Sequence, residues 1–188
     1  MDQASSTRYA HPVRRVAAYL VDGIVVGALV LGIVTVMTVL FGPTVRFDDA
    51  STTGLIVDRG RAAANAVLAV LASAVYFVGS WVRSGRTLGA AVLDLRVAAA
   101  DGTRHLSVAE AIVRWIAIGA PFALLSPIVR GSASLVTSLT LLTIAWSAVL
   151  LVTTIVDRRH RGIHDRLARS IVIRGRAPER HETTETAI

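Results

Sequence analysis

The sequence contains no cysteine and no lysine. Without cysteine the chain cannot form disulfides, use a thiolate nucleophile or bind a metal ion or an iron–sulfur cluster through sulfur. Its 20 basic residues are all arginines, which together with many Ala and Val residues is typical of a GC-rich bacterial genome. A glycine-rich phosphate loop, a GxSxG nucleophile elbow and paired catalytic carboxylates are also missing. The sequence therefore predicts no enzyme, no catalytic residues and no cofactor.

What the chain does contain is an excess of apolar residues. They make up 53% of the 188 residues, and the mean hydropathy of +0.59 is too high for an ordinary soluble domain. The net charge is +7, but the arginines lie beside apolar runs, where the positive-inside rule explains them. We predict an integral membrane protein that contacts anionic lipid headgroups and does not bind nucleic acid.

Four apolar runs are long enough to cross a hydrocarbon core of roughly 30 Å as helices. The first is too long for the apolar region of a signal peptide, so an uncleaved helix is expected. The third contains Pro121 and Pro127, which predict either a broken span or a re-entrant segment. The four predicted spans cover residues 16–41, 62–82, 106–129 and 135–156.

The distribution of arginine favours a cytoplasmic position for both termini. Three arginines precede the first span, four lie in residues 83–105 and eight in residues 157–180, whereas the charges of the 42–61 loop cancel. The sequence thus predicts an all-α, multi-pass protein of the bacterial inner membrane with four transmembrane helices. Its predicted parts are a polar segment 1–13, a transmembrane domain 14–174 and a disordered cytoplasmic tail 175–188.

Two smaller elements are expected on the cytoplasmic side. Residues 87–93 are short and apolar enough for an interfacial helix. Residues 95–99, followed by the turn residues Asp101 and Gly102, predict a strand. The strand-like run 171–173 can pair with residues 95–97, because the charge distribution places both on the same side.

The first span carries one charge, Asp22, seven residues beyond Arg15. The two lie two turns apart on one helix face, with Asp22 about 10 Å deeper in the bilayer. An ionisable group at that depth usually faces protein or water. The pair predicts either an ion or proton site, in which burial makes the carboxyl titratable, or a structural charge pair with Arg15 extending to the headgroups.

The third span carries Glu110 and Arg114, four residues apart in the favourable order for an ion pair on one face. Arg114 is expected at about the depth of Asp22, which predicts a pair between the two across the helices. The alternative is that Arg114 only extends its side chain to the headgroups.

Two further patterns have weaker implications. His160, His164 and Asp165 resemble a ligand set, but the arginines around them would repel a cation, so we predict a polar cluster and no metal site. Gly85 and Gly89 form a GxxxG pattern at the membrane edge, where it is weak evidence for helix dimerisation.

Several motifs occur in order over residues 11–174. They are Arg15-x-x-Ala18-x-x-x-Asp22, Gly85-x-Thr87-Leu88-Gly89 followed by Leu95-Arg96-Val97 and Asp101-Gly102, Arg114-Trp115, and His164-Asp165-Arg166-Leu167-Ala168 with Ser170-Ile171-Val172-Ile173. Together they resemble the RDD family of bacterial membrane proteins. Ser170 stands where that family more often has Thr, and Ala90 where a basic residue is common.

The resemblance implies a small polytopic inner-membrane protein with its motifs near the cytoplasmic face. Arg15, Asp22 and Asp165 correspond to the Arg and the two Asp of the family name. Transport has been proposed for the family, including cation/proton antiport for some members. Actinobacterial members also occur beside lipid import systems of the mammalian-cell-entry type.

The leading functional expectation is a transport-related protein for an ion or small solute, with cation/proton exchange as one mechanism. Asp22 is its expected buried carboxylate, with Arg15 and Arg114 as partners and Asp165 as a cytoplasmic cap. The alternative is a non-catalytic accessory or scaffolding subunit of a membrane complex, such as a mammalian-cell-entry-type system. A homo-oligomer or a larger complex is expected because four helices are few for a self-sufficient carrier. The supporting residues are Glu110, His164, Gly85, Thr87 and Gly89.

Overall fold

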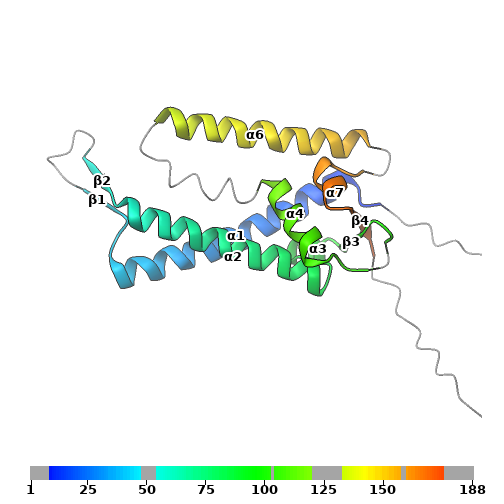
Figure 1. Ribbon diagram of the computed structural model, residues 1–188, viewed down its shortest axis with the longest axis horizontal. Helices are drawn as coiled ribbons and strands as arrows, with labels where there is room; N and C mark the ends of the chain where they lie inside the picture. The colour runs from blue at the N-terminus through cyan, green and yellow to red at the C-terminus, as the bar shows by residue number, and fades with distance from the viewer. Residues whose placement is uncertain (1–8, 48–53, 103, 120–132, 158–159, 176–188) are drawn as a thin grey trace, which may run out of the picture.

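The computed structural model describes residues 9–47, 54–102, 104–119, 133–157 and 160–175. Two long helices, α1 (Pro12–Phe41) and α2 (Arg59–Arg83), run antiparallel, and a third, α6 (Ala133–Val156), lies along one side of them (Figure 1). Small elements gather where α1 begins and α2 ends, around a two-stranded sheet, and we call this the sheet end. A β-hairpin occupies the opposite end (Figure 1).

Local sequence explains where α1 starts and stops. The ring nitrogen of His11 accepts from the backbone N–H of Val13 at 3.4 Å, and Pro12 occupies the first turn, where a missing N–H costs nothing. Gly42 ends the helix with φ of +85°, while its N–H still donates to the carbonyl of Thr38. The predicted first span is confirmed as a continuous helix, beginning a few residues earlier than expected.

The loop predicted between the first two spans is a β-hairpin in part. Strands β1 (Val45–Phe47) and β2 (Leu55–Val57) pair antiparallel, with Arg46 opposite Ile56. Asp58 then caps α2 by accepting from the N–H of Arg61 at 3.0 Å. Three residues per strand give too little periodicity for the sequence to have indicated this hairpin.

The short helix and the strand pairing expected beyond the second span are both confirmed. Helix α3 (Leu88–Val92) is followed by β3 (Leu95–Ala99), which pairs antiparallel with β4 (Ser170–Arg174). Val97 lies opposite Val172 in this register. The sheet thus joins two segments that are far apart in sequence and places both at the sheet end.

The third predicted span differs from the expectation. Helix α4 (Val108–Ile118) ends at Gly119, which adopts φ of +86° and caps it. With 11 residues it extends only about 16 Å, too short to cross a bilayer. The rest of the predicted span, residues 120–129, lies outside the described residues. Three described helices are long and apolar enough to span a membrane, and the fourth span is not confirmed.

The last helix, α7 (Ile163–Leu167), is a short helix of five residues between α6 and β4. The chain before α1 also reaches the sheet end, since Tyr9 forms a bridge with Ile173 and the N–H of Ala10 donates to the carbonyl of Val172 at 3.0 Å. Ala10 is completely buried, so the predicted polar segment 1–13 already contributes to the core. That core is centred on Trp81, Leu95 and Trp115.

Candidate functional site

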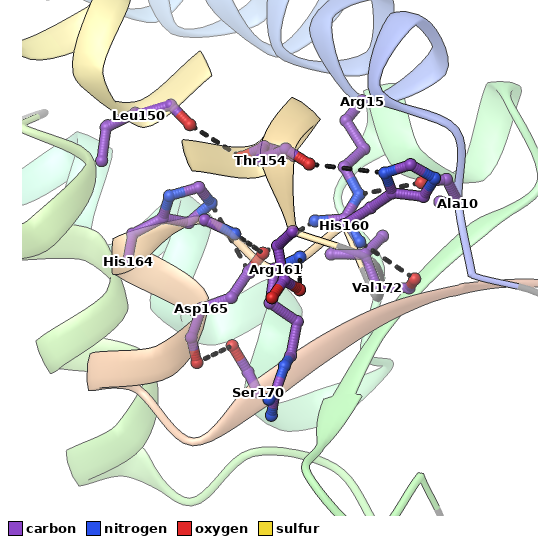
Figure 2. A network of polar contacts seen from close by, with 12 residues as sticks. Ala10, Arg15, Leu150, Thr154, His160, Arg161, His164, Asp165, Ser170 and Val172 are labelled. Atoms are coloured by element: carbon purple, nitrogen blue, oxygen red, sulfur yellow. Dashed lines mark hydrogen bonds and ion pairs between the residues drawn. The ribbon is translucent and has the colours of Figure 1, made fainter. Parts of the chain in front are cut away.

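The polar centre of the sheet end is built around Asp165 in α7. Its carboxylate, with no exposed surface, accepts from Nη1 of Arg15 at 2.7 Å and from Nη1 of Arg114 (the region is drawn in Figure 2). The N–H of Gly162 also donates to this carboxylate at 3.2 Å. We call Arg15, Arg114 and Asp165 the charge cluster. It joins α1, α4 and α7, elements that the sequence separates by up to 150 residues.

Arg15 extends toward the start of α1 and ties the helix to the sheet. Its Nε donates to the carbonyl of Ala10 at 3.3 Å, and its Nη2 donates to the carbonyl of Val172 at 3.2 Å (Figure 2). Each branch of the guanidinium therefore has an acceptor, which suits the forked geometry of arginine. The side chain is buried, contrary to the alternative that it extends to the headgroups.

Arg114 is also completely buried and does not extend toward the headgroups. Besides Asp165, it donates to the hydroxyl of Ser170 at 2.6 Å and to that of Tyr19 at 3.1 Å. Its guanidinium lies 5.2 Å from the ring centre of Trp81, within cation–π range. Tyr19, Trp81 and Ser170 were not predicted as partners, because only the folded chain brings them around α4.

Burial and the neighbouring arginines shift the pKa values of Asp165 and His164 in α7. Burial alone would raise the pKa of the Asp165 carboxyl, but the positive charges of Arg114 and Arg15 and the imidazole of His164 hold it well below its usual range. The pKa of His164 is lowered to about 4, mainly by burial and also by the charges of Arg114 and Arg15, against the opposing effect of Asp165. At neutral pH the carboxylate is therefore ionised and the imidazole is neutral.

The predicted pairs of Asp22 with Arg15 and with Arg114 are wrong. Asp22, 1% exposed, accepts from the hydroxyl of Tyr76 at 2.7 Å, the hydroxyl of Thr87 at 2.6 Å and the N–H of Gly89 at 2.8 Å. Helical side chains tilt toward the N-terminus, which carries Arg15 away from Asp22. Asp165, expected only as a cap, takes both guanidiniums instead.

Asp22 nevertheless lies near the charge cluster. Asp22, Arg15 and Arg114 line one small void of about 20 Å³, together with Trp81 and Thr87. Three of the four residues predicted as a network thus line one void, and the fourth, Asp165, pairs with both arginines. Neither guanidinium donates to Asp22, which separates the network into an ionic part and a part made of neutral donors.

The segment Gly85–Gly89 provides two of the three neutral donors, the hydroxyl of Thr87 and the N–H of Gly89. Thr87 is the N-cap of α3, accepting from the N–H of Ala90 at 3.2 Å while donating to Asp22. A Cβ on Gly89 would lie 2.1 Å from the carbonyl oxygen of Ala18, so only glycine permits this approach to α1. Gly85 has φ of +67° at the preceding turn. The two glycines therefore pack this segment against other elements of the same chain, Gly89 against α1 and Gly85 against β3.

Glu110 does not pair with Arg114. It accepts from Nη1 and Nη2 of Arg104, each at 2.7 Å, and forms a capping box with Ser107 at the start of α4. The two histidines are also separate, since α7 begins at Ile163 and His160 has φ of +52°, so they share no helical face. Within the described residues no three potential ligand side chains converge on a metal position.

The arrangement suits fixed binding and anchoring better than acid–base chemistry, because every carboxylate oxygen of Asp22 and Asp165 already accepts hydrogen bonds. No curated protein and no solved structure matches the chain. A model of the RDD family matches residues 9–169, which include all of α1 to α7 and every residue of the charge cluster. The protein is thus a membrane protein with apolar helices, and it belongs to the RDD family.

Proposed function

We propose that the protein is a non-catalytic accessory or scaffolding subunit of a larger complex in the bacterial inner membrane. The observation that carries this proposal is the saturation of both buried aspartates. Asp165 accepts from two guanidiniums and Asp22 accepts from three neutral donors, so neither carboxylate has an oxygen without a partner that could bind a transported ion. A transport site must release its ligands in each cycle, whereas a scaffold is stabilised by hydrogen bonds and ion pairs that remain formed.

The exposed face of α6 supports a role in assembly. Many of its apolar side chains are exposed, and its tryptophan Trp146 makes a hydrogen bond to the carbonyl of Ala117 at 2.9 Å. In a membrane such a face is covered by lipid or by partner helices, which associate through packing rather than through a hydrophobic driving force. Small hydroxyl residues such as Ser147, which binds its own helix backbone, suit close helix packing.

The orientation that we propose places the sheet end in the cytoplasm, the side that the sequence predicts for both termini. The arginine-rich segments 83–105 and 157–175 meet at this end, because β3 pairs with β4. The positive-inside rule favours a cytoplasmic position for such segments, where anionic headgroups also attract them. Labelling of single cysteines introduced into the cysteine-free chain, at the exposed Phe47 of the hairpin and at Arg174 of β4, tests the two ends separately.

The competing function is cation/proton exchange through Asp22, and it can be tested directly. Proteoliposomes with the wild type, Asp22→Asn and Asp58→Asn are compared for cation-dependent proton flux. Asp58 is a matched control because it is a helix cap, and Asn caps a helix as well as Asp does. The proposal expects no flux in any of them and a co-purifying membrane complex with the wild type. Flux that is lost only in a folded Asp22→Asn variant would establish transport and overturn the scaffold role.

A further inference from the structure

An elongated cavity of about 500 Å³ lies between α1, α2, α4 and α6. This volume is within the range of about 300–1,000 Å³ that is usual for ligand pockets. On α1 the lining extends from Pro12 to Val26, which is about 21 Å at 1.5 Å per residue. Most of the lining is apolar and includes Leu20, Phe77, Leu150 and Leu151. A long apolar cavity suits a hydrocarbon chain better than a compact polar solute.

The cavity opens sideways between α1 and α6. Leu20 of α1 and Leu151 of α6 line it, yet 67% and 41% of their surfaces are exposed. Both helices are long and apolar enough to span a membrane, so the medium outside these side chains is lipid hydrocarbon. A ligand that already resides in the bilayer can therefore enter without crossing water.

The sheet end of the cavity is polar. Arg15, Tyr19 and His164 line it there, and no described lining residue is an aspartate or glutamate. Arg15 is the one charged residue of the lining. Each branch of the Arg15 guanidinium already has an acceptor, so Arg15 contributes charge, while the Tyr19 hydroxyl and the ring N–H of His164 are the donors at this end. This end lies at the depth where α1 begins, near the headgroup level of a bilayer.

His164 provides independent evidence for a ligand. Its side chain is only 5% exposed, yet neither ring nitrogen has a hydrogen-bond partner. The distance of 3.5 Å from Nε2 to Oδ1 of Asp165 is too long for a good hydrogen bond. A neutral imidazole provides one N–H donor and one acceptor, and leaving both unused in a buried position is costly. The ring lines the cavity, so an occupant can satisfy it.

We propose that this cavity binds a long-chain fatty acid, with the acyl chain along α1 and α6 and the carboxylate at Arg15, Tyr19 and His164. The charge cluster behind this end holds two guanidiniums, Arg15 and Arg114, against the single carboxylate of Asp165, and its net positive charge favours an anionic head over a neutral one. The single elongated volume selects one chain. This site stands apart from the proposed scaffold role, because its occupancy can be measured on the purified chain alone.

The test uses the purified full-length protein in phosphatidylcholine nanodiscs with a photoactivatable, diazirine-bearing analogue of palmitic acid. Cross-linked residues are identified by mass spectrometry. Unlabelled palmitate and hexadecanol, which has the same chain without the charge, are then compared as competitors of the labelled analogue. We expect labels on the α1 and α6 residues of the cavity and about tenfold stronger competition by palmitate. Labels spread evenly over the lipid-facing surfaces, or equal competition by both compounds, would overturn the proposal.

Two variants localise the binding. Gly23 lines the cavity, and a Cβ there meets nothing within 4 Å, so Gly23→Leu adds side-chain volume at the cavity. Gly32 is equally unobstructed but lies nine residues further, on the opposite face of α1, and Gly32→Leu is the matched control. Gly23→Leu should reduce labelling about tenfold while Gly32→Leu leaves it unchanged. Equal labelling in both folded variants would contradict the site.

The third variant, His164→Phe, keeps an aromatic ring and removes both nitrogens. The acyl chain should still bind in the cavity, but the difference in competition strength between palmitate and hexadecanol should become smaller. Unchanged discrimination in this variant would show that the head does not lie at His164.

Discussion

Asp22 and Asp165 are equally inaccessible to solvent, but the chain satisfies them in different ways. Asp165 sits between two guanidiniums, whereas Asp22 accepts hydrogen bonds from two hydroxyls and one backbone N–H. The first solution gathers charge from distant elements. The second uses neutral dipoles from α2 and from the start of α3, elements that already pack on α1.

The difference indicates that the two regions have separate structural tasks. The charge cluster fixes α7 and β4 to α1 and α4, and a charge left there without a partner is expensive. Asp22 fixes α3 to α1 through ordinary, charge-assisted hydrogen bonds, which are individually weaker and more easily replaced. Mutations at the two sites should therefore differ in size, although both replace one aspartate.

The largest effect is expected for Asp165→Asn. It leaves two buried guanidiniums facing a neutral amide, which should cost about 3–5 kcal/mol in the free energy of unfolding. Asp22→Asn is the matched variant and should cost less than half as much, because its partners carry no charge. Reversible unfolding in mixed detergent and SDS measures both. Equal losses would remove the distinction between the two regions.

A pH titration of stability should show the effect of His164 next. In the unfolded chain this residue has its ordinary pKa near 6.5, and burial lowers the folded value to about 4. The unfolded chain therefore binds the extra proton first, so stability falls as the pH decreases from about 6.5 to about 4. The loss should be on the order of 3 kcal/mol.

The variant His164→Phe should show a flatter profile over the same pH window. The pKa of Asp165 is held below its ordinary value of 3.8, so its own contribution is lost only at lower pH. An identical slope in the variant would assign the pH dependence to other groups.

Gly89→Ala should sharpen the description of the Asp22 region. The new Cβ would approach the carbonyl of Ala18 to 2.1 Å and displace α3 from α1, at a cost of about 1–3 kcal/mol. Gly79→Ala, in α2, adds the same methyl group where nothing lies within 4 Å and should be neutral or stabilising. If the two variants have the same free energy of unfolding, the close approach at Gly89 is not what positions α3.

Thr87→Val should have a smaller effect in the same region. It removes the donor at 2.6 Å from Asp22 and the N-cap acceptor of α3, but Asp22 keeps Tyr76 and Gly89. A loss of about 1–2 kcal/mol is expected from the unfolding curves. A loss as large as that of Asp165→Asn would mean that Asp22 depends on one donor.

The smallest effect is expected for Arg104→Gln. Arg104 is 51% exposed and pairs with Glu110 at the rim of the sheet end. Water screens such pairs, so the loss of stability should be the smallest of the series and decrease in high salt. A larger loss would show that the buried cluster is not the main electrostatic anchor.

The sequence by itself determined the long apolar helices, the short helix α3 and the pairing of β3 with β4. The helices follow from the length of the apolar runs and from the start signal at Pro12, and the strand pairing follows from turn residues and from the charge distribution that places both segments on one side. The motif residues Arg15, Asp22, Arg114 and Asp165 were also recognisable, because charges next to or within apolar runs are rare.

Only the tertiary structure decided which charges pair. Spacing along one helix favoured Arg15 with Asp22 and Glu110 with Arg114, yet Asp165 takes both arginines. Spacing describes neighbours within an element, whereas α7 enters between α1 and α4 from a distant part of the chain. The same limit applies to the hydroxyls that hold Asp22 and to the cavity beside Arg15, since each is formed by side chains from several elements that meet only after folding.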